Sequence, residues 1–234
     1  MKKSVKILWR LFFIGLIFFN VIIVMASFGL LGKMPSIDDL QNPTASQSSQ
    51  VYADDGSMMG KYFLQDRVNV NYKDINPNVM NALIATEDER FMEHSGIDAR
   101  AIARAVFSAG TEGGGSTITM QTAKNLFTGD VSSNIFMRLV QKIKESIIAV
   151  KLERNFTKQE IITLYLNTVA FSDNVFGIRN ASKTFFSKEP SKLKIEEAAV
   201  LIGMLKAPST YNPRTNISNA KSRRNTVIEQ MEKK

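Results

Sequence analysis

The most informative segment of the chain reads TEDERFMEHSG and covers residues 86–96. Just before it, beginning at Met80, apolar residues and then Glu87 recur at the i, i+3, i+4, i+7 spacing that places side chains on one face of an α-helix. Glu87 therefore belongs to an apolar stripe, which Phe91 would extend if the helix continued. A carboxylate bracketed by apolar groups can take up a proton near neutral pH, so Glu87 is a candidate general base.

The same segment has a simpler interpretation. Glu87, Asp88 and Glu89 together are also compatible with a solvated acidic helix end, and Asp88 and Glu89 fit that description better than Glu87 does. His94 is the only histidine of the chain, so it cannot belong to a multi-histidine zinc site or to a Ser-His-Asp relay with a spare base. We expect His94 to order local structure.

A glycine-rich segment follows at residues 112–125 and reads EGGGSTITMQTAKN. Its three glycines free the backbone before a run that can form a helix carrying Gln121 and Lys124. Glycine loops of this kind cradle anions, although a flexible surface loop is the alternative. The segment is not a Walker loop, because the Gly-Lys-Ser/Thr ending is missing.

A third segment, at residues 141–156, reads QKIKESIIAVKLERNF. Its helical periodicity predicts a core stripe of Ile143, Ile147 and Val150, with Lys142 and Glu145 on neighbouring faces. An amphipathic surface helix with charged flanks is the alternative.

The N-terminal part of the chain contains an uncharged apolar run at residues 11–31. About 20 such residues suffice to cross a hydrocarbon core roughly 30 Å thick. Residues 1–10 hold four basic and no acidic side chains, which predicts a cytoplasmic N-terminus and export of the rest. A cleavable signal peptide is the alternative, but the run is longer than a signal core, so a retained anchor is favoured.

Composition limits the remaining possibilities. The 234 residues, 44% of them hydrophobic, accommodate one folded domain and an anchor, and the lack of cysteine excludes disulfides and thiol catalysis. Four of the eight excess positive charges precede the apolar run. The modest basic balance that remains suits anionic lipid headgroups or a pyrophosphate better than nucleic acid, and ordinary surface charge explains it equally well.

The rest of the chain divides into a linker and a mainly α domain. Residues 32–50 are polar and predict a linker, and residues 51–72 predict a β-hairpin around the turn signal Asp54-Asp55-Gly56. Asn76-Pro77 predicts the start of a helix. Further helices are expected from Asp98 through Phe107, from the capping box of Thr157 and Glu160 through about Asn167, and over Ile195–Leu205.

Taken together, the three segments resemble the peptidoglycan glycosyltransferase family, found as the N-terminal module of class A penicillin-binding proteins and as stand-alone enzymes. The family motif Glu-Asp-x-x-Phe-x-x-His-x-Gly is complete at residues 87–96. The motif Gly-x-Ser-Thr-hydrophobic-Thr-x-Gln, with a downstream Lys-Asn, matches residues 114–121 and 124–125. Later stretches extend the resemblance from about Val51 to the C-terminus.

The third family motif, Arg-Lys-x-x-Glu, is only partly present. Gln141 replaces its arginine, whereas Lys142 and Glu145 match. The missing guanidinium would face substrate phosphate in the family. Either Arg138, one turn earlier, substitutes for it, or pyrophosphate binding is weaker.

The resemblance implies a lysozyme-like, mainly α domain over residues 51–234, with a cleft between two lobes and a hydrophobic jaw that dips into the bilayer. Candidates for the jaw are Phe127, Ile135, Phe136 and Leu139. The single-pass anchor would hold this domain on the outer face of the bacterial cytoplasmic membrane, where lipid II, the lipid-linked glycan strand and the membrane itself are the expected partners. A transpeptidase domain or protein is a further partner that the family allows.

The resemblance also implies a reaction. Lipid II is the acceptor, the lipid-pyrophosphate-linked glycan is the donor, and a β-1,4 linkage forms with inversion as undecaprenyl pyrophosphate leaves. By carry-over, Glu87 is the general base for the acceptor 4-hydroxyl, and Glu145 assists pyrophosphate departure, directly or through a divalent cation such as Mg or Mn, with no organic cofactor. Lys124 and Lys142 would stabilise the developing charge. The other expected substrate-binding residues are Asp88, Phe91, Thr117, Gln121, Asn125 and Arg138.

Two other functions remain open at this point. A lytic enzyme on the same fold would also place a glutamate in a helical cleft, but there the carboxyl acts first as an acid on a glycosidic oxygen. A non-catalytic or truncated module of a bifunctional class A penicillin-binding protein is the second alternative, which the substitution at Gln141 keeps open.

Overall fold

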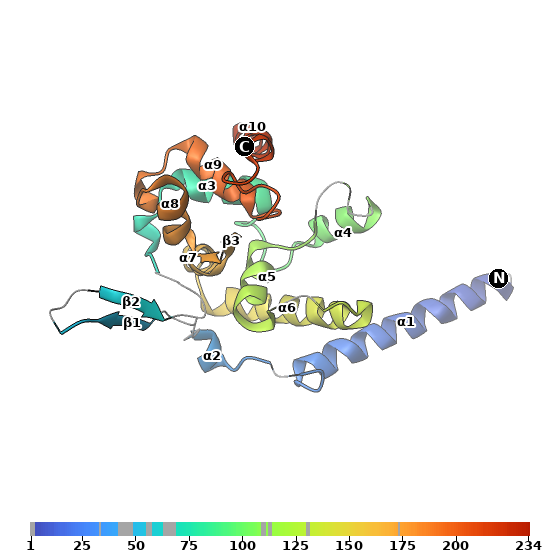
Figure 1. Ribbon diagram of the computed structural model, residues 1–234. Helices are drawn as coiled ribbons and strands as arrows, with labels where there is room; N and C mark the ends of the chain where they lie inside the picture. Colours follow the sequence, from blue (N-terminus) through green and yellow to red (C-terminus); the bar gives the residue numbers. More distant parts are fainter. Residues whose placement is uncertain are drawn as a thin grey trace.

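The computed structural model describes residues 3–32, 34–41, 49–54, 58–62, 69–108, 111, 114–129, 132–172 and 174–234. These residues form mostly helices and two small antiparallel sheets of two strands each (Figure 1). The mainly α class, the apolar N-terminal helix and the short β-hairpin are therefore confirmed.

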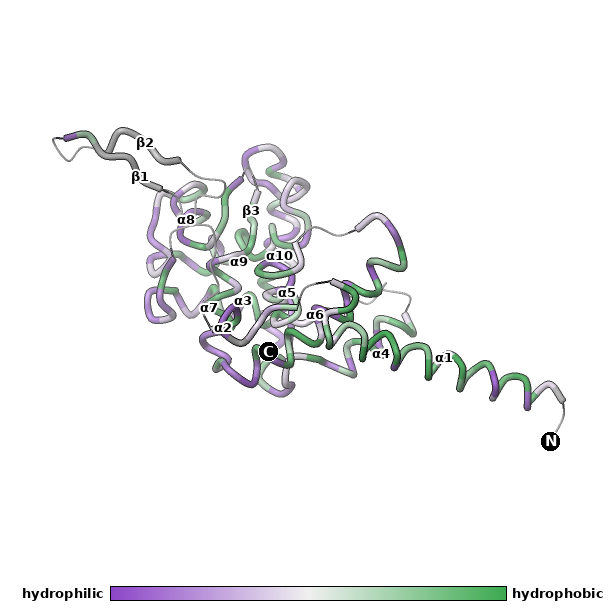
Figure 2. The backbone as a smooth tube through the Cα atoms, turned by 90° about the horizontal axis from the view of Figure 1, so that it is seen from below, coloured by the Kyte–Doolittle hydropathy of each residue, from purple (hydrophilic) through white to green (hydrophobic). Residues whose placement is uncertain are grey.

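The N-terminal helix α1 spans Lys3–Ser27 and is long and apolar enough to cross a membrane, with a mean hydropathy of 2.5 over its most apolar window. It projects from the rest of the chain as an apolar rod, green in Figure 2. The helix starts before the apolar run of residues 11–31, and it stops at Ser27 because the chain turns there, with positive φ at Gly29 and Gly32. The limits of the membrane span stay a prediction.

The segment after the anchor is only partly the linker that its composition predicts. A short helix, α2, spans Ile37–Gln41, and its start is stabilised by reciprocal hydrogen bonds between Ser36 and Asp39. Leu40 is fully buried on α2 and packs in a cluster with residues of two later helices. The linker prediction is therefore wrong for this segment, because one apolar side chain docks it onto the domain.

We expect Leu40→Ala to lower the free energy of unfolding by about 2 kcal/mol, the lower end of the range for a fully buried leucine, because the cluster around it is small. Chemical denaturation of the detergent-solubilised protein measures the change. Ile217→Ala, at a residue 62% exposed, serves as the control and should cost much less. Equal losses for the two variants would show that α2 does not dock in solution.

The predicted hairpin is present. Strand β1 (Ser49–Tyr52) pairs antiparallel with β2 (Met58–Tyr62), while part of the predicted turn, residues 55–57, lies outside the described residues.

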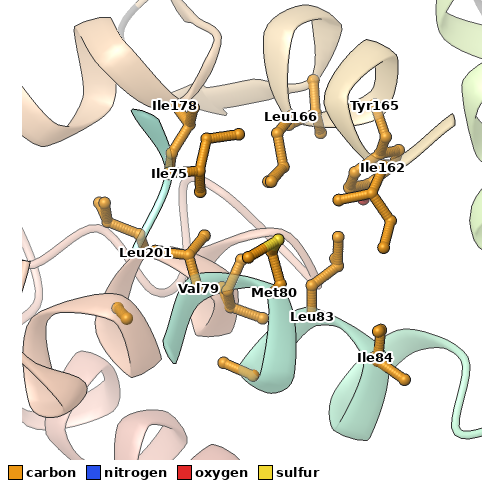
Figure 3. Close-up of a cluster of buried hydrophobic side chains, with 14 of the residues drawn as sticks. Ile75, Val79, Met80, Leu83, Ile84, Ile162, Tyr165, Leu166, Ile178 and Leu201 are labelled. Atoms are coloured by element: carbon orange, nitrogen blue, oxygen red, sulfur yellow. The ribbon is translucent and has the colours of Figure 1, made fainter. Parts of the chain in front are cut away.

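The main core lies among five helices and is shown in Figure 3. These are α3 (Pro77–Glu87), α7 (Lys158–Thr168), α8 (Ile178–Phe186), α9 (Ile195–Met204) and α10 (Ile217–Glu232). Short elements connect them: η1 (Tyr72–Asp74), η3 (Pro190–Lys192), and β3 (Ala170–Ser172) paired with β4 (Val175–Phe176). The predicted cap at Asn76 and the capping box of Thr157 and Glu160 are confirmed, and α9 ends one residue before the predicted limit.

A second group of helices lies between this core and the anchor (Figure 1). It consists of α5 (Ile118–Ala123), the π-helical turn η2 (Lys124–Thr128) and the long α6 (Ile135–Asn155), with α4 (Ala99–Phe107) capped by Asp98 as predicted. The apolar stripe predicted for α6 was expected to pack in the core of the domain, and this is wrong for two of its residues. Ile143 and Ile147 pack against Ile22 and Ala26 of α1, whereas Ile148 and Leu152 face the domain.

The apolar residues predicted for the jaw fall into two groups. Ile135, Phe136 and Leu139 are exposed at the start of α6, next to the anchor, and Ile135 is 83% exposed. Phe127 instead is half-buried and packs against the cluster of Leu40, so its assignment to the jaw is wrong. On α4, Val106 and Phe107 add further exposed apolar surface.

Candidate active site

Glu87 is the last residue of α3, and the chain leaves the helix at Asp88. The Glu87 side chain is half-buried, and its Oε2 accepts a hydrogen bond of 2.9 Å from Nε2 of Gln121 on α5. The structure therefore brings the first and second motifs together at this carboxylate. Phe91, in the turns that follow, is fully buried beneath the ammonium of Lys158, so its predicted contact with substrate is wrong.

Asp88 is a structural residue, and the expectation that it is solvated is wrong. Its carboxylate is buried, lies 3.0 Å from Nε2 of His94, and accepts a 2.9 Å hydrogen bond from the Ile118 N–H at the start of α5. Nδ1 of His94 accepts from the Gly96 N–H, which leaves the ring proton on Nε2, facing Asp88. The local ordering role predicted for His94 is confirmed.

Thr117 caps α5 and holds it to the same loop. Its hydroxyl donates to the Gly96 carbonyl at 2.6 Å and accepts from the Met120 N–H at 3.1 Å, and the residue is almost completely buried. The predicted contact of Thr117 with sugar or phosphate stays a prediction, although its hydroxyl proton is already donated within the protein.

On α6, Glu145 and Lys142 form an ion pair of 2.7 Å between Oε2 and Nζ. Glu145 is almost fully buried, whereas the lysine side chain is half-exposed. A buried carboxylate needs such a partner, because its loss of hydration is costly. Lys142 also donates to Oγ of Ser116 at 2.9 Å, which ties the ion pair to the glycine-rich segment.

A polar cavity of about 220 Å³ lies next to the candidate base. Glu87 and Ser116 both line it, whereas Lys142 and Glu145 do not, and Lys142 is connected to the cavity only through its hydrogen bond to Ser116. The charged side chains that line the cavity are Glu87, Asp88, Glu89, Arg90, Asp98 and Arg104. Arg90 pairs with Asp98. Burial alone would raise the pKa of Asp98, but the Ala101 N–H and the Arg90 guanidinium lower it.

The π-helical turn carries Lys124 and Asn125, both half-buried. Among the described residues, none pairs with the Lys124 ammonium, and Nδ2 of Asn125 is buried without a hydrogen-bond partner. Neither residue lines the polar cavity, and their roles in binding remain predictions.

Gln141, which replaces the family arginine, and Arg138, its suggested substitute, contact different parts of the chain. Arg138 is exposed, and its Nε donates to the Ser132 carbonyl at 2.8 Å, so no described contact brings it to Lys142. Gln141 reaches the end of η2 instead, with Nε2 3.4 Å from the Thr128 hydroxyl and 3.4 Å from the Gly129 carbonyl. The structure thus gives no support to Arg138 as the substitute.

Two residues of the site were given no role from the sequence, Ser116 and Tyr165. Tyr165 is fully buried on α7, and its hydroxyl donates to Oε1 of Gln121 at 3.0 Å. Burial, together with the nearby charge of Glu87, raises the pKa of Tyr165 well above its usual value. One sequence signal was available, since a tyrosine on an otherwise apolar helix face needs a partner for its hydroxyl.

The chain therefore combines an apolar N-terminal helix long enough to cross a membrane with a helical domain whose polar cavity is lined by Glu87. The model of the family described as Transglycosylase matches residues 55–232. The chain belongs to this transglycosylase family, and the domain is a glycosyltransferase domain.

The curated relatives are penicillin-binding proteins. Penicillin-binding protein 1A of Escherichia coli (strain K12) is 36% identical over 203 residues, which cover 85% of this chain and 23% of the relative. Penicillin-binding protein 1F of Bacillus subtilis (strain 168) is 40% identical over 188 residues, 79% of this chain and 26% of the relative. For penicillin-binding protein 1A of Aquifex aeolicus the identity is 38% over 223 residues, 94% and 29% of the two chains.

The chain thus spans about a quarter of the length of these relatives. Among solved structures, the crystal structure of penicillin-binding protein 1A from Haemophilus influenzae aligns with a TM-score of 0.42 and 24% identity, covering 80% of this chain and 18% of that one.

Proposed function

We propose that the protein is a peptidoglycan glycosyltransferase that polymerises lipid II into β-1,4-linked glycan strands and releases undecaprenyl pyrophosphate. The observation that carries this proposal is the connection through Ser116, which lines the cavity of Glu87 and accepts a hydrogen bond from Lys142. A base beside a cationic group is what glycosyl transfer from a pyrophosphate donor requires.

In the proposed reaction, Glu87 removes the proton of the acceptor 4-hydroxyl as its oxygen attacks the anomeric carbon of the donor. The bond between that carbon and the pyrophosphate oxygen breaks, and the pyrophosphate leaves with the electron pair. Attack from the opposite face inverts the anomeric centre. Gln121 holds Oε2 of Glu87, which leaves Oε1 to take the proton. Lys142 and Lys124 would stabilise the charge on the leaving group.

Glu145 would act in this scheme by holding the Lys142 ammonium at the cavity rather than by touching the sugar. Among the described residues, no three His, Cys, Asp or Glu side chains converge to hold an ion, and the Glu145 carboxylate is already paired with Lys142. These residues do not by themselves fit a divalent cation, so no step of the scheme depends on one.

The anchor and the exposed apolar residues at the start of α6 and the end of α4 support a location at the membrane. We place the N-terminus in the cytoplasm and the domain on the outer face of the bacterial membrane, as the basic residues before the span indicate. Because both substrates are lipid-tethered, a shared membrane raises their effective concentration at the cavity.

Polymerisation of fluorescent lipid II by the detergent-solubilised chain tests the proposal, with Mg or Mn titrated in and a chelator added in parallel. Polymer of several disaccharides is the expected product. Release of soluble muropeptides from finished cell wall, with no polymer from lipid II, would instead identify a lytic enzyme and overturn the proposal.

Replacement of Lys142 by methionine is expected to slow polymerisation roughly tenfold. The variant removes one cation from the leaving group, Lys124 remains, and Glu145 is left buried without its partner. Steady-state rates with fluorescent lipid II measure the change. Lys151→Met, on the same helix, is the matched control, and an equal loss in both variants would argue against a role for Lys142.

A further inference from the structure

Three helices contribute one side chain each to a short chain of hydrogen bonds that ends at the candidate base. The Tyr165 hydroxyl of α7 donates to Oε1 of Gln121 on α5, and Nε2 of Gln121 donates to Oε2 of Glu87 at the end of α3. Tyr165 lies in the main core, on the α7 side opposite α3 (Figure 3), so its ring and hydroxyl have a fixed position.

The direction of these hydrogen bonds follows from their chemistry. An ionised carboxylate only accepts, and a glutamine amide has one accepting and one donating end. If the amide were reversed, its oxygen would face the Glu87 carboxylate, so the acceptor-only carboxylate selects the orientation with Nε2 toward it. The Tyr165 hydroxyl, whose pKa is raised by burial, then donates to Oε1 and anchors the amide from its other end.

We infer that Tyr165 is a positioning residue for proton transfer, which fixes the Gln121 amide so that Nε2 holds Oε2 of Glu87 and Oε1 stays open to the acceptor hydroxyl. This inference rests on the proposed role of Glu87 as the base. It also changes the role of Gln121, which the sequence assigned to substrate oxygens and the structure places against the carboxylate.

The hydrogen bond from Gln121 is made to Oε2 of the Glu87 carboxylate. A hydrogen bond to the ionised form of a carboxyl favours that form. The other charged groups at the cavity, Asp88, Glu89, Arg90, Asp98 and Arg104, stay the same in the variants described below. A difference in pH dependence between wild type and variant then reports on the hydrogen bonds alone.

The first test compares Tyr165→Phe with Thr168→Val. Phenylalanine keeps the ring in the core and removes only the hydroxyl. Thr168 is buried on the same helix and donates to the Leu164 carbonyl, so its valine variant loses a structural hydrogen bond without touching Gln121. We expect Tyr165→Phe to lower kcat about tenfold with KM within about twofold. The acidic limb of its pH profile should move to higher pH, and Thr168→Val should show neither change.

The second test asks whether Tyr165 acts through Gln121. In a Gln121→Met background, Tyr165→Phe should cause no further loss of kcat, because the amide that it orients is gone. Additive losses would overturn the inference, as would a Tyr165→Phe protein whose Tm falls while kcat and the pH profile stay unchanged.

A third measurement does not depend on activity, so it separates the inference from the proposed function. The Glu87 carboxyl is labelled with ¹³C, and its chemical shift is measured by NMR in the full chain. The signal should move in the same direction in Tyr165→Phe and in Gln121→Met, the second of which keeps Tyr165 and its packing. An unchanged signal would overturn the inference even if lipid II were polymerised normally. A changed signal in a protein that makes no polymer would leave the positioning intact and reject the proposed function alone.

Discussion

A Glu87→Gln protein is expected to polymerise lipid II at least about 100-fold more slowly than the wild type, the usual contribution of a general base. The amide keeps the size of the side chain and its place beside Gln121, but it cannot take the proton of the acceptor hydroxyl. Turnover of fluorescent lipid II at saturating concentration measures the loss. A reduction under threefold would exclude Glu87 as the base.

The matched control is Glu93→Gln, in the turns that follow Asp88. Glu93 is exposed and does not line the cavity, so its amide variant should keep nearly the full rate. Similar losses in Glu93→Gln and Glu87→Gln would mean that the loop as a whole, and not the carboxylate, is sensitive.

The largest effect on stability is expected for Gly96→Ala, with a loss of about 3 kcal/mol or more in the free energy of unfolding. Gly96 has a φ of +95°, and an added Cβ would lie 2.8 Å from both the carbonyl carbon and oxygen of Ala149 on α6. To relieve this contact, either the backbone at Gly96 must move, together with the loop of His94, or the backbone at Ala149 must move, together with α6. Denaturant unfolding measures the loss, and polymerisation should fall with it, because Thr117 and His94 both bond to Gly96.

Alanine variants at two other glycines separate the two causes of that loss, the positive φ and the close contact of the added Cβ. Gly129 also has a positive φ, +65°, but has nothing within 4 Å of an added Cβ, so Gly129→Ala reports the backbone cost alone, about 2 kcal/mol. Gly114 has neither constraint, and its alanine variant should be close to neutral. If Gly96→Ala were as mild as Gly129→Ala, the close contact with Ala149 would not exist in solution.

The features that could be predicted from the sequence are those whose causes lie within a few residues. The caps at Asn76, Asp98 and Thr157 use a side chain and a backbone N–H two or three positions apart, so residue type and spacing are enough to find them. The apolar run of α1 needs only its own composition. The family motifs predicted that Glu87, Lys142 and Glu145 share one site. In the structure Glu87 and Ser116 line one cavity, and Ser116 accepts a hydrogen bond from Lys142, which pairs with Glu145.

The errors concern residues whose role depends on a distant partner. Phe91 belongs to a family motif, yet it fills the core. Leu40 is a single apolar residue in a polar stretch, and nothing nearby in sequence marks it as docked.

The sequence by itself therefore determined the helical class, the apolar N-terminal helix and the helix starts, and it supplied the carboxylates proposed to react. Only the tertiary structure decided that α6 packs one apolar face against the anchor and another against the domain. It also decided that the Tyr165 hydroxyl donates a hydrogen bond to Gln121. The physical reason is that periodicity shows which face of a helix is apolar but not which surface covers it. That choice is made by packing between elements far apart in the chain.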